Sequence, residues 1–170
     1  NLSGVSCYLL RAGDGFVLID TGVANKRAAL RDELASVGCR PGHLKLIILT
    51  HGDVDHADNA AHLRAEYGAK VAMHRGDAGM VERGDMSVGR KARPDKVSTL
   101  GRVIILIGRL TPLFGRQSEF ETFAPDLYLE DGQDLSGYGF AAQVLHLPGH
   151  SRGSLGILTA AGELFCGDLL

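Results

Sequence analysis

The sequence lacks the features that would assign the protein to a membrane or to nucleic acid. No uninterrupted apolar run approaches the ~20 residues of a membrane-spanning helix, and no secretory signal opens the chain. The net charge of −2 leaves no excess of basic residues for binding phosphate groups. We therefore expect neither a membrane nor nucleic acid among the main partners.

Cysteine is also scarce. The three cysteines, Cys7, Cys39 and Cys166, lie far apart and match neither a paired spacing nor that of a zinc ribbon. An odd number without a disulfide framework favours reduced thiols, and with them a cytoplasmic location. The sequence also contains no internal repeat and no low-complexity tract.

The composition is that of an ordinary globular domain. The chain has 170 residues, of which 45% are hydrophobic and 22% charged, so we expect a single domain over residues 1–170 with a sizeable core. Strand and helix patterns alternate, which predicts an α/β fold. The predicted strands are 5–10, 16–19, 43–49, 70–73, 126–129, 140–147, 154–159 and 163–166, and the predicted helices are 25–37 and 55–67. Asp14-Gly15 predicts a hairpin between the first two strands.

The segment 75–125 departs from this alternation. Residues 75–94 are polar and rich in glycine, and residues 97–113 include a hydrophobic run that predicts an amphipathic or largely buried helix. Three roles for that helix stay open: a packed core helix, a lid over a site, or a contact in a homodimer. We therefore expect 75–125 to be a helical insertion or lid.

The strand predicted at 43–49 ends in a dense group of potential metal ligands. This strand is apolar on both faces, as expected for the middle of a sheet. Two histidines and two aspartates follow it within six residues: His51, Asp53, Asp55 and His56. Open α/β sheets place their chemistry at the carboxyl ends of their strands, so this group is the first candidate for a functional site.

Other predicted strands end in residues of the same kind. His150 follows the strand 140–147, and Asp168 follows the strand 163–166. If these strand ends converge, they supply the imidazole and carboxylate ligands, one of them bridging, that a dinuclear hydrolytic site requires. Asp20, after the strand 16–19, has two open interpretations: it contacts a metal ligand from behind, or it caps the following turn.

These motifs resemble those of a known family. Thr50-His51-x-Asp53-x-Asp55-His56 is similar to the metal motif of the metallo-β-lactamase fold hydrolases, which normally reads Thr-His-x-His-x-Asp-His. The resemblance continues at Asp20-Thr21-Gly22, at Pro148-Gly149-His150-Ser151 and at Gly167-Asp168, in the same order along the chain. The nearest branch is the glyoxalase II-like group, which hydrolyses thioesters and other esters. The resemblance implies an αββα sandwich, which we expect to be truncated at its C-terminal end.

The resemblance also implies a role for each ligand. His51, Asp53 and His150 would form the first metal site, Asp55 and His56 would belong to the second, and Asp168 would bridge the two. The implied cofactors are two divalent metal ions, with zinc as the first choice and iron or manganese as alternatives. The family adds one later histidine to the second site, and no residue of this chain matches it. The unassigned His43, His62, His74 and His146 are predicted to be structural or surface residues.

Asp53 stands where the family motif has a histidine. A set of two histidines and one carboxylate is a normal catalytic zinc arrangement. The extra carboxylate nevertheless makes the site more neutral and favours harder ions such as manganese or iron. The flavodiiron proteins carry a carboxylate at the same motif position, which offers a second precedent.

These considerations predict metal-dependent hydrolysis of an ester, thioester or lactone of a small-molecule substrate. A metal-bound hydroxide would attack the carbonyl carbon, and Asp55 would orient it. Two alternatives stay open: a diiron redox protein of the flavodiiron type, and a metal-binding domain without turnover.

Overall fold

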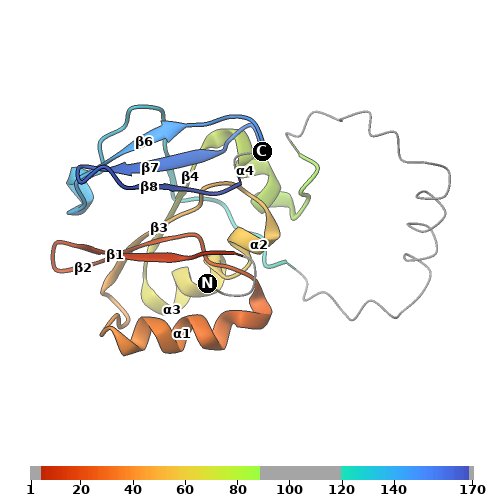
Figure 1. The fold of residues 1–170 in the computed structure, drawn as a ribbon. Helices are drawn as coiled ribbons and strands as arrows, with labels where there is room; N and C mark the ends of the chain where they lie inside the picture. The colour runs from red at the N-terminus through yellow and green to blue at the C-terminus, as the bar shows by residue number, and fades with distance from the viewer. Residues whose placement is uncertain (1–4, 89–119, 169–170) are drawn as a thin grey trace.

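The computed structural model describes residues 5–88 and 120–168, which form two facing sheets and a layer of helices (Figure 1). A five-stranded sheet has the order β1-β2-β3-β4-β5, and a three-stranded sheet has the order β6-β7-β8. Helices α1 and α3 cover the face of the larger sheet that points away from the smaller one (Figure 1). The α/β class is confirmed, and the described residues form three of the four layers of the predicted αββα sandwich.

The strands follow the predicted pattern closely. The larger sheet contains β1 (Tyr8–Ala12), β2 (Gly15–Ile19), β3 (Leu44–Ile48), β4 (Lys70–Met73) and β5 (Leu127–Tyr128). The smaller sheet contains β6 (Ala142–His146), β7 (Leu155–Thr159) and β8 (Leu164–Cys166). Strands β1 and β2 form the predicted antiparallel hairpin, whereas β2 to β5 run parallel. The smaller sheet is antiparallel throughout.

The two hydrophobic cores lie on opposite faces of the larger sheet. Side chains of β3 alternate between them: Ile47 packs with α1 and α3, and Leu46 and Ile48 pack against the smaller sheet. All three side chains are 0% exposed. This explains why the strand is apolar on both faces, and it anchors the ligand-bearing turn that follows it.

The helix predicted at 55–67 is in fact two helices, so this prediction was wrong in its continuity. Helix α2 (Val54–Ala57) and helix α3 (Ala60–Tyr67) are separated at Asp58 and Asn59. The Asp58 carboxylate accepts a hydrogen bond from the backbone N–H of Ala24 at 2.8 Å, and the Asn59 amide donates to the carbonyl of Thr21 at 2.8 Å. Side chains that bond to other backbone segments compete with helix continuation. The break therefore ties the ligand motif to the loop after β2.

The loop after β2 leads through η1 (Ala24–Lys26) into α1 (Arg27–Ser36), close to the predicted helix 25–37. A second short 3₁₀ turn, η2 (Ser136–Tyr138), precedes β6. Helix α3 ends at Gly68, which has a φ of +70°, a conformation that favours glycine.

Helix α4 (Arg75–Arg83) falls within the segment 75–125 and was not predicted as a separate helix. Gly76 and Gly79 lower its intrinsic helix propensity, which hid it in the sequence. Burial of Met80 and Val81 stabilises it, and the His74 side chain caps it by accepting the N–H of Gly76 at 3.0 Å. The helix predicted over 97–113 lies outside the described residues.

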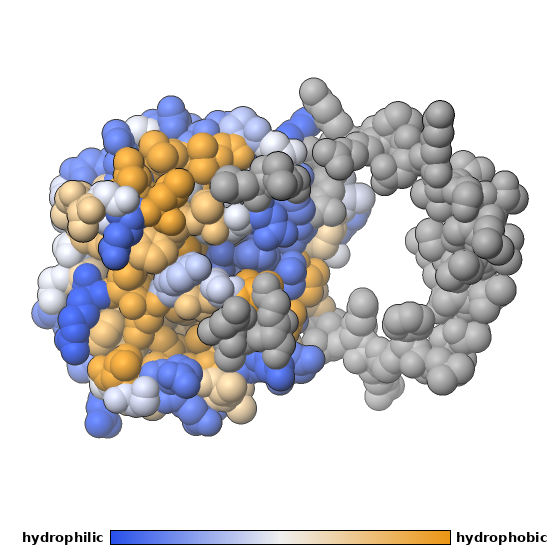
Figure 2. All heavy atoms as spheres, in the orientation of Figure 1, coloured by the Kyte–Doolittle hydropathy of each residue, from blue (hydrophilic) through white to orange (hydrophobic). Residues whose placement is uncertain are grey.

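Apolar residues are exposed along one side of the molecule. Figure 2 shows hydrophobic residues over the β6–β8 sheet and toward the strands below it. Leu164 on β8 is 47% exposed, and Tyr8 on β1 is 39% exposed.

Within 5–88 and 120–168, no helix is long and apolar enough to cross a membrane. The three cysteines are free thiols, and the cytoplasmic location stays a prediction.

The central strand offers a direct test of the core. We expect Ile47→Ala to lower the free energy of unfolding by roughly 2–5 kcal/mol, because it leaves a cavity at a fully buried position. Val37→Ala, at a side chain that is 48% exposed, should change it by less than about 0.5 kcal/mol. Urea denaturation of both variants measures the difference. Equal effects of the two substitutions would contradict the placement of β3 in the core.

Candidate metal centre

The six predicted ligands come from four segments that meet at one edge of the two sheets. His51 and Asp53 follow β3, and Asp55 and His56 lie on α2. His150 lies in the turn between β6 and β7, and Asp168 follows β8. Parallel strands bring their carboxyl ends to the same edge of a sheet, and the smaller sheet adds its ligands from across the inner core.

A first group of ligands gathers around the Asp53 carboxylate. Its Oδ2 atom lies 2.8 Å from Nε2 of His150 and 3.4 Å from Nε2 of His51. The rings of His51 and His150 lie edge to face, with centroids 4.9 Å apart. These are the three residues that the family resemblance assigned to one metal position.

A second group gathers around His56, and Asp168 lies between the two groups. Nε2 of His56 is 3.9 Å from Oδ2 of Asp55 and 3.7 Å from Oδ1 of Asp168. The other oxygen of Asp168, Oδ2, is 3.9 Å from Nε2 of His150. One carboxylate oxygen thus faces each group, which is the arrangement that a bridging ligand requires.

The chemistry of this cluster fits a divalent metal ion. His51 is 1% exposed, and among the described residues its Nε2 makes no hydrogen bond. A buried polar atom without a partner is costly unless something else satisfies it. His51, His150 and Asp168 offer ligand atoms that all lie within 4.8 Å of one another, and imidazole nitrogen and carboxylate oxygen are donors of the kind that bind a divalent cation. The remaining candidates, Asp53, Asp55 and His56, extend this group on either side.

Asp20 hydrogen-bonds to His56 directly and to His51 through Thr50. These contacts decide between the two interpretations of Asp20 given from the sequence, contact with a candidate metal ligand or capping of a turn. Its Oδ2 accepts from Nδ1 of His56 at 2.8 Å and from the hydroxyl of Thr50 at 2.7 Å. Its Oδ1 accepts from the backbone N–H of Thr50 at 2.8 Å. The carboxylate therefore contacts a candidate ligand directly, and it also joins β2 to the end of β3.

These hydrogen bonds fix which nitrogen of each histidine is available for a metal. A carboxylate accepts and does not donate, so Nδ1 of His56 carries a proton, and in the neutral imidazole that binds a metal Nε2 is the nitrogen with the lone pair. The Thr50 hydroxyl gives its proton to Asp20 and therefore accepts from Nδ1 of His51, 3.0 Å away. In the neutral ring of His51, Nε2 is then also the nitrogen with the lone pair. A single carboxylate thus sets the tautomer of two candidate ligands.

The backbone at Asp20 is held in an unusual conformation. Among the described residues, Asp20 is the one non-glycine residue with a positive φ, at +57°. Its N–H nevertheless donates to the carbonyl of Ile48 at 2.9 Å. Such backbone strain persists where surrounding contacts enforce it, and it is concentrated at functional sites.

The electrostatics of the cluster favour positive charge. Burial by itself would lower the pKa of His56, but the hydrogen bond and charge of Asp20, together with Asp55 and Asp168, raise its pKa overall. Carboxylates surround this imidazole strongly enough to outweigh the cost of burying a charge. The same field attracts a metal cation.

Two buried contacts of the site were not predicted from the sequence. Asp77 on α4 is 0% exposed and accepts hydrogen bonds from the loops on either side of it. Asn59 ties the end of α2 to the loop after β2. The sequence feature that could have indicated Asp77 as part of the site is its position four residues after β4, at the sheet edge where the other acidic residues lie.

The four unassigned histidines lie outside the cluster, as predicted. His74 and His146 stack on each other with ring centroids 4.1 Å apart. His62 lies 3.3 Å from Glu66 on the same helix, and His43 contacts the carbonyl of Gly38 at 3.3 Å. Burial and the neighbouring His146 lower the pKa of His74.

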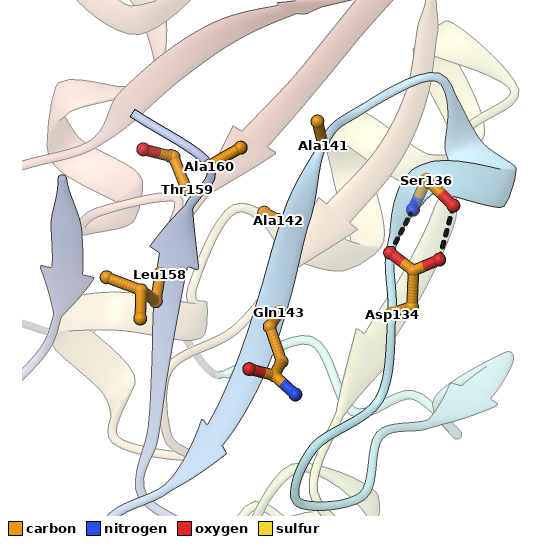
Figure 3. A pocket seen from close by; sticks show the side chains of 8 residues that line it. All are labelled: Asp134, Ser136, Ala141, Ala142, Gln143, Leu158, Thr159 and Ala160. Atoms are coloured by element: carbon orange, nitrogen blue, oxygen red, sulfur yellow. Dashed lines mark hydrogen bonds between the residues drawn. The ribbon is translucent and has the colours of Figure 1, made fainter. Parts of the chain in front are cut away.

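A pocket of about 430 Å³ over β6 and β7 does not contain the cluster (Figure 3). Its one acidic side chain, Asp134, accepts hydrogen bonds from the backbone and hydroxyl of Ser136 (Figure 3). The lining holds no histidine or cysteine. It offers no group for general acid–base or metal chemistry beyond this paired carboxylate, so the cluster at the sheet edge is the stronger candidate.

Comparison with known proteins identifies relatives of this chain. The family model described as metallo-beta-lactamase superfamily matches residues 1–170. The chain is 28% identical over 174 residues to the acyl-coenzyme A thioesterase MBLAC2 of Bos taurus, covering 96% of this chain and 57% of the thioesterase. It is 27% identical over 131 residues to the hydroxyacylglutathione hydrolase GloC of Haemophilus influenzae, covering 75% of this chain and 50% of that protein. The chain thus spans about half the length of these curated relatives.

Solved structures share the fold. A metallo-beta-lactamase of Cronobacter sakazakii, described by its HARLDQ motif, superposes with a TM-score of 0.68 at 23% identity, over 95% of this chain and 55% of that one. The metallo-beta-lactamase GOB-18 of Elizabethkingia meningoseptica superposes with a TM-score of 0.68 at 20% identity, over 94% of this chain and 52% of that one.

Asp20 provides a test of the support behind the histidines. We expect Asp20→Asn to weaken zinc binding about 10–100-fold, because an amide cannot accept all the hydrogen bonds that fix His51 and His56. Competition with a chromogenic chelator measures the affinity. Asp14→Asn, at a side chain that is 91% exposed, serves as the control and should leave the affinity unchanged. Equal zinc affinities in the two variants would rule out this role of Asp20.

Proposed function

Because the chain belongs to the metallo-beta-lactamase superfamily, we propose that it carries the metal centre of a hydrolase that cleaves a thioester, ester or lactone of a small molecule. The observation that carries this proposal is the position of Asp168, with one oxygen toward His56 and the other toward His150. That geometry joins two ligand groups into one centre, as two-metal hydrolysis requires.

The names of the relatives favour a thioester among the three substrate classes. MBLAC2 is named as an acyl-coenzyme A thioesterase, and GloC as a hydrolase of hydroxyacylglutathione. In both names the acyl group belongs to a thiol-bearing carrier. The same names favour hydrolysis over the redox chemistry of a diiron protein.

The proposed centre is most open on the side of its carboxylates. The side chains of Asp55 and Asp168 are 52% and 51% exposed, whereas those of His51 and His56 are 1% and 6% exposed. A substrate carbonyl would therefore approach past Asp55 and Asp168. The buried histidines stay behind the metal positions and keep the site rigid.

Divalent ions, when bound, supply a Lewis acid for the carbonyl oxygen and lower the pKa of water. The chain's own part is to orient the reactants. Asp55 accepts a hydrogen bond from the attacking water and so directs its lone pair toward the carbonyl carbon. Asp20, through Thr50 and directly, keeps the two histidines in the tautomers that hold the ions.

Asp53 bears on which ions the centre prefers. In place of the neutral imidazole of the usual motif it offers a carboxylate, whose Oδ2 lies within hydrogen-bond distance of His150. An oxygen ligand moves preference toward harder ions such as manganese or iron, and the added negative charge weakens the Lewis acid. We propose zinc as the first candidate, with manganese and iron as alternatives.

Asp55 allows the reaction to be tested. We expect the metal-loaded full-length protein to hydrolyse acyl thioesters, and Asp55→Asn to lower kcat by about 10²–10⁴-fold, because the amide no longer orients the attacking water. A thiol-trapping assay over a panel of thioesters, esters and lactones provides the measurement. Asp32→Asn, on the exposed face of α1, should retain the full rate. If protein with bound metal hydrolysed no compound of the panel, the proposal would be wrong.

Asp53 allows the metal preference to be tested separately. Asp53→His should raise the preference for zinc over manganese by about tenfold or more, because a nitrogen ligand replaces a hard oxygen. Elemental analysis after equilibration with equal amounts of both ions reports the occupancy. If the exchange altered neither the identity nor the amount of bound metal, Asp53 would not be a ligand.

A further inference from the structure

Asp77 is a buried carboxylate whose partners lie outside its own helix. It belongs to the first turn of α4 and is 0% exposed. Its Oδ2 accepts from the hydroxyl of Ser151 at 2.5 Å and from the N–H of Gly52 at 3.2 Å, and its Oδ1 accepts from the N–H of Gly153 at 2.8 Å. All three donors are neutral, so the charge is stabilised by directed hydrogen bonds.

Those donors belong to the two loops that carry the proposed ligands of the first metal position. Gly52 lies between His51 and Asp53, and Ser151 directly follows His150. Asp77 thus connects the two loops through one side chain. The segments are also joined by the N–H of Leu155, which donates to the carbonyl of Thr50 at 2.7 Å.

The backbones meet at Asp77 too closely for ordinary side chains. A Cβ added to Gly153 would lie 2.7 Å from Cγ of Asp77, and one added to Gly76 would lie 3.0 Å from the carbonyl oxygen of Arg152. A Cβ on Gly52 would lie 3.0 Å from Cβ of Met80. Each of the three segments has a glycine at the contact, which lets the first turn of α4 pack between both loops.

Capping of α4 does not account for Asp77. The His74 side chain already accepts the N–H of Gly76 at the start of this helix. A carboxylate near a helix N-terminus gains some stability from the helix dipole, but that effect needs no contact with Gly52 or Ser151. The specific partners of Asp77 therefore call for another role.

We propose that Asp77 is a positioning residue that sets the separation of the His51–Asp53 loop and the His150 loop. It thereby sets the distance between the two histidines of the first metal position. This inference rests on the proposed function in one respect, namely that these histidines bind metal.

Asp77→Asn tests the inference with little change in size. The amide nitrogen would face a backbone N–H on one side or the other, so either Gly52 or Gly153 loses its acceptor. We expect the affinity of the full-length protein for cobalt(II) to fall about 10–100-fold, as for other groups that orient metal ligands. The visible absorption of the cobalt(II) form should shift as well, because its coordination geometry changes.

Asp126→Asn is the control. The Asp126 carboxylate also accepts from a backbone N–H, that of Val71 at 2.8 Å, but it joins the amino-terminal ends of β4 and β5, whereas the ligand loops lie at the carboxyl ends of the strands. This variant should lose stability while keeping the cobalt(II) affinity and spectrum of the unmodified protein. Ser151→Ala adds a second comparison: its effect on affinity should be smaller than that of Asp77→Asn and non-additive with it.

The possible outcomes separate this inference from the proposed function. If Asp77→Asn loses stability but keeps the cobalt(II) affinity and spectrum, the positioning role is overturned. If the unmodified protein takes up no metal, the proposed function fails, and amide hydrogen exchange of the metal-free protein decides the role of Asp77. Exchange at Gly52 and Gly153 should be faster in Asp77→Asn than in Asp126→Asn, and equal exchange would overturn the inference.

Discussion

The hydrogen bonds of the Asp20 carboxylate are the interaction on which the rest of the site depends. They reach the backbone and hydroxyl of Thr50 and the ring of His56, and so join β2, the end of β3 and helix α2. Because the carboxylate only accepts, the proton of each neutral imidazole lies on Nδ1, and Nε2 of both His51 and His56 is the nitrogen that could bind a metal. The positive φ at Asp20 is a strained backbone conformation, and it places one side chain within reach of all three partners. Fold and site are therefore coupled at this residue.

The two-sheet architecture explains why ligands so distant in sequence can meet. Parallel strands β2, β3 and β4 deliver Asp20, His51 and Asp77 to one edge of the larger sheet. The smaller sheet brings His150 and Asp168 to the same edge, and the inner core between the sheets fixes the two relative to each other. A shift of one sheet against the other would alter the distances from His150 and Asp168 to the candidate ligands Asp53 and His56. Rigidity of the core is thus a requirement of the site.

The sequence predicted what depends on local pattern and missed what depends on distant partners. Strand β3 and the group of candidate ligands after it could be predicted, because an apolar run with an abrupt polar end is a local signal. The break between α2 and α3 could not, since it depends on bonds from Asn59 to Thr21, 38 positions away. Helix α4 was missed because Gly76 and Gly79 weaken a helix by themselves, and the reason for Gly76 is its close packing against Arg152 in the His150 loop. The contacts of Asp77 with the two loops depend on that packing, so the sequence could not predict them.

The excess of carboxylates also bears on the kind of bond that the proposed centre would cleave. Asp53, Asp55 and Asp168 lie within 3.9 Å of histidine nitrogens, and such a concentration of negative charge calls for cations. Yet each added carboxylate reduces the power of those cations to polarise a carbonyl. A thioester suits such a centre better than an ordinary ester, because its carbonyl is more electrophilic and its thiolate leaves at a pH where an alkoxide would need a proton. Asp53, the proposed ligand that departs from the family motif, therefore favours the same substrate class that we propose for this centre.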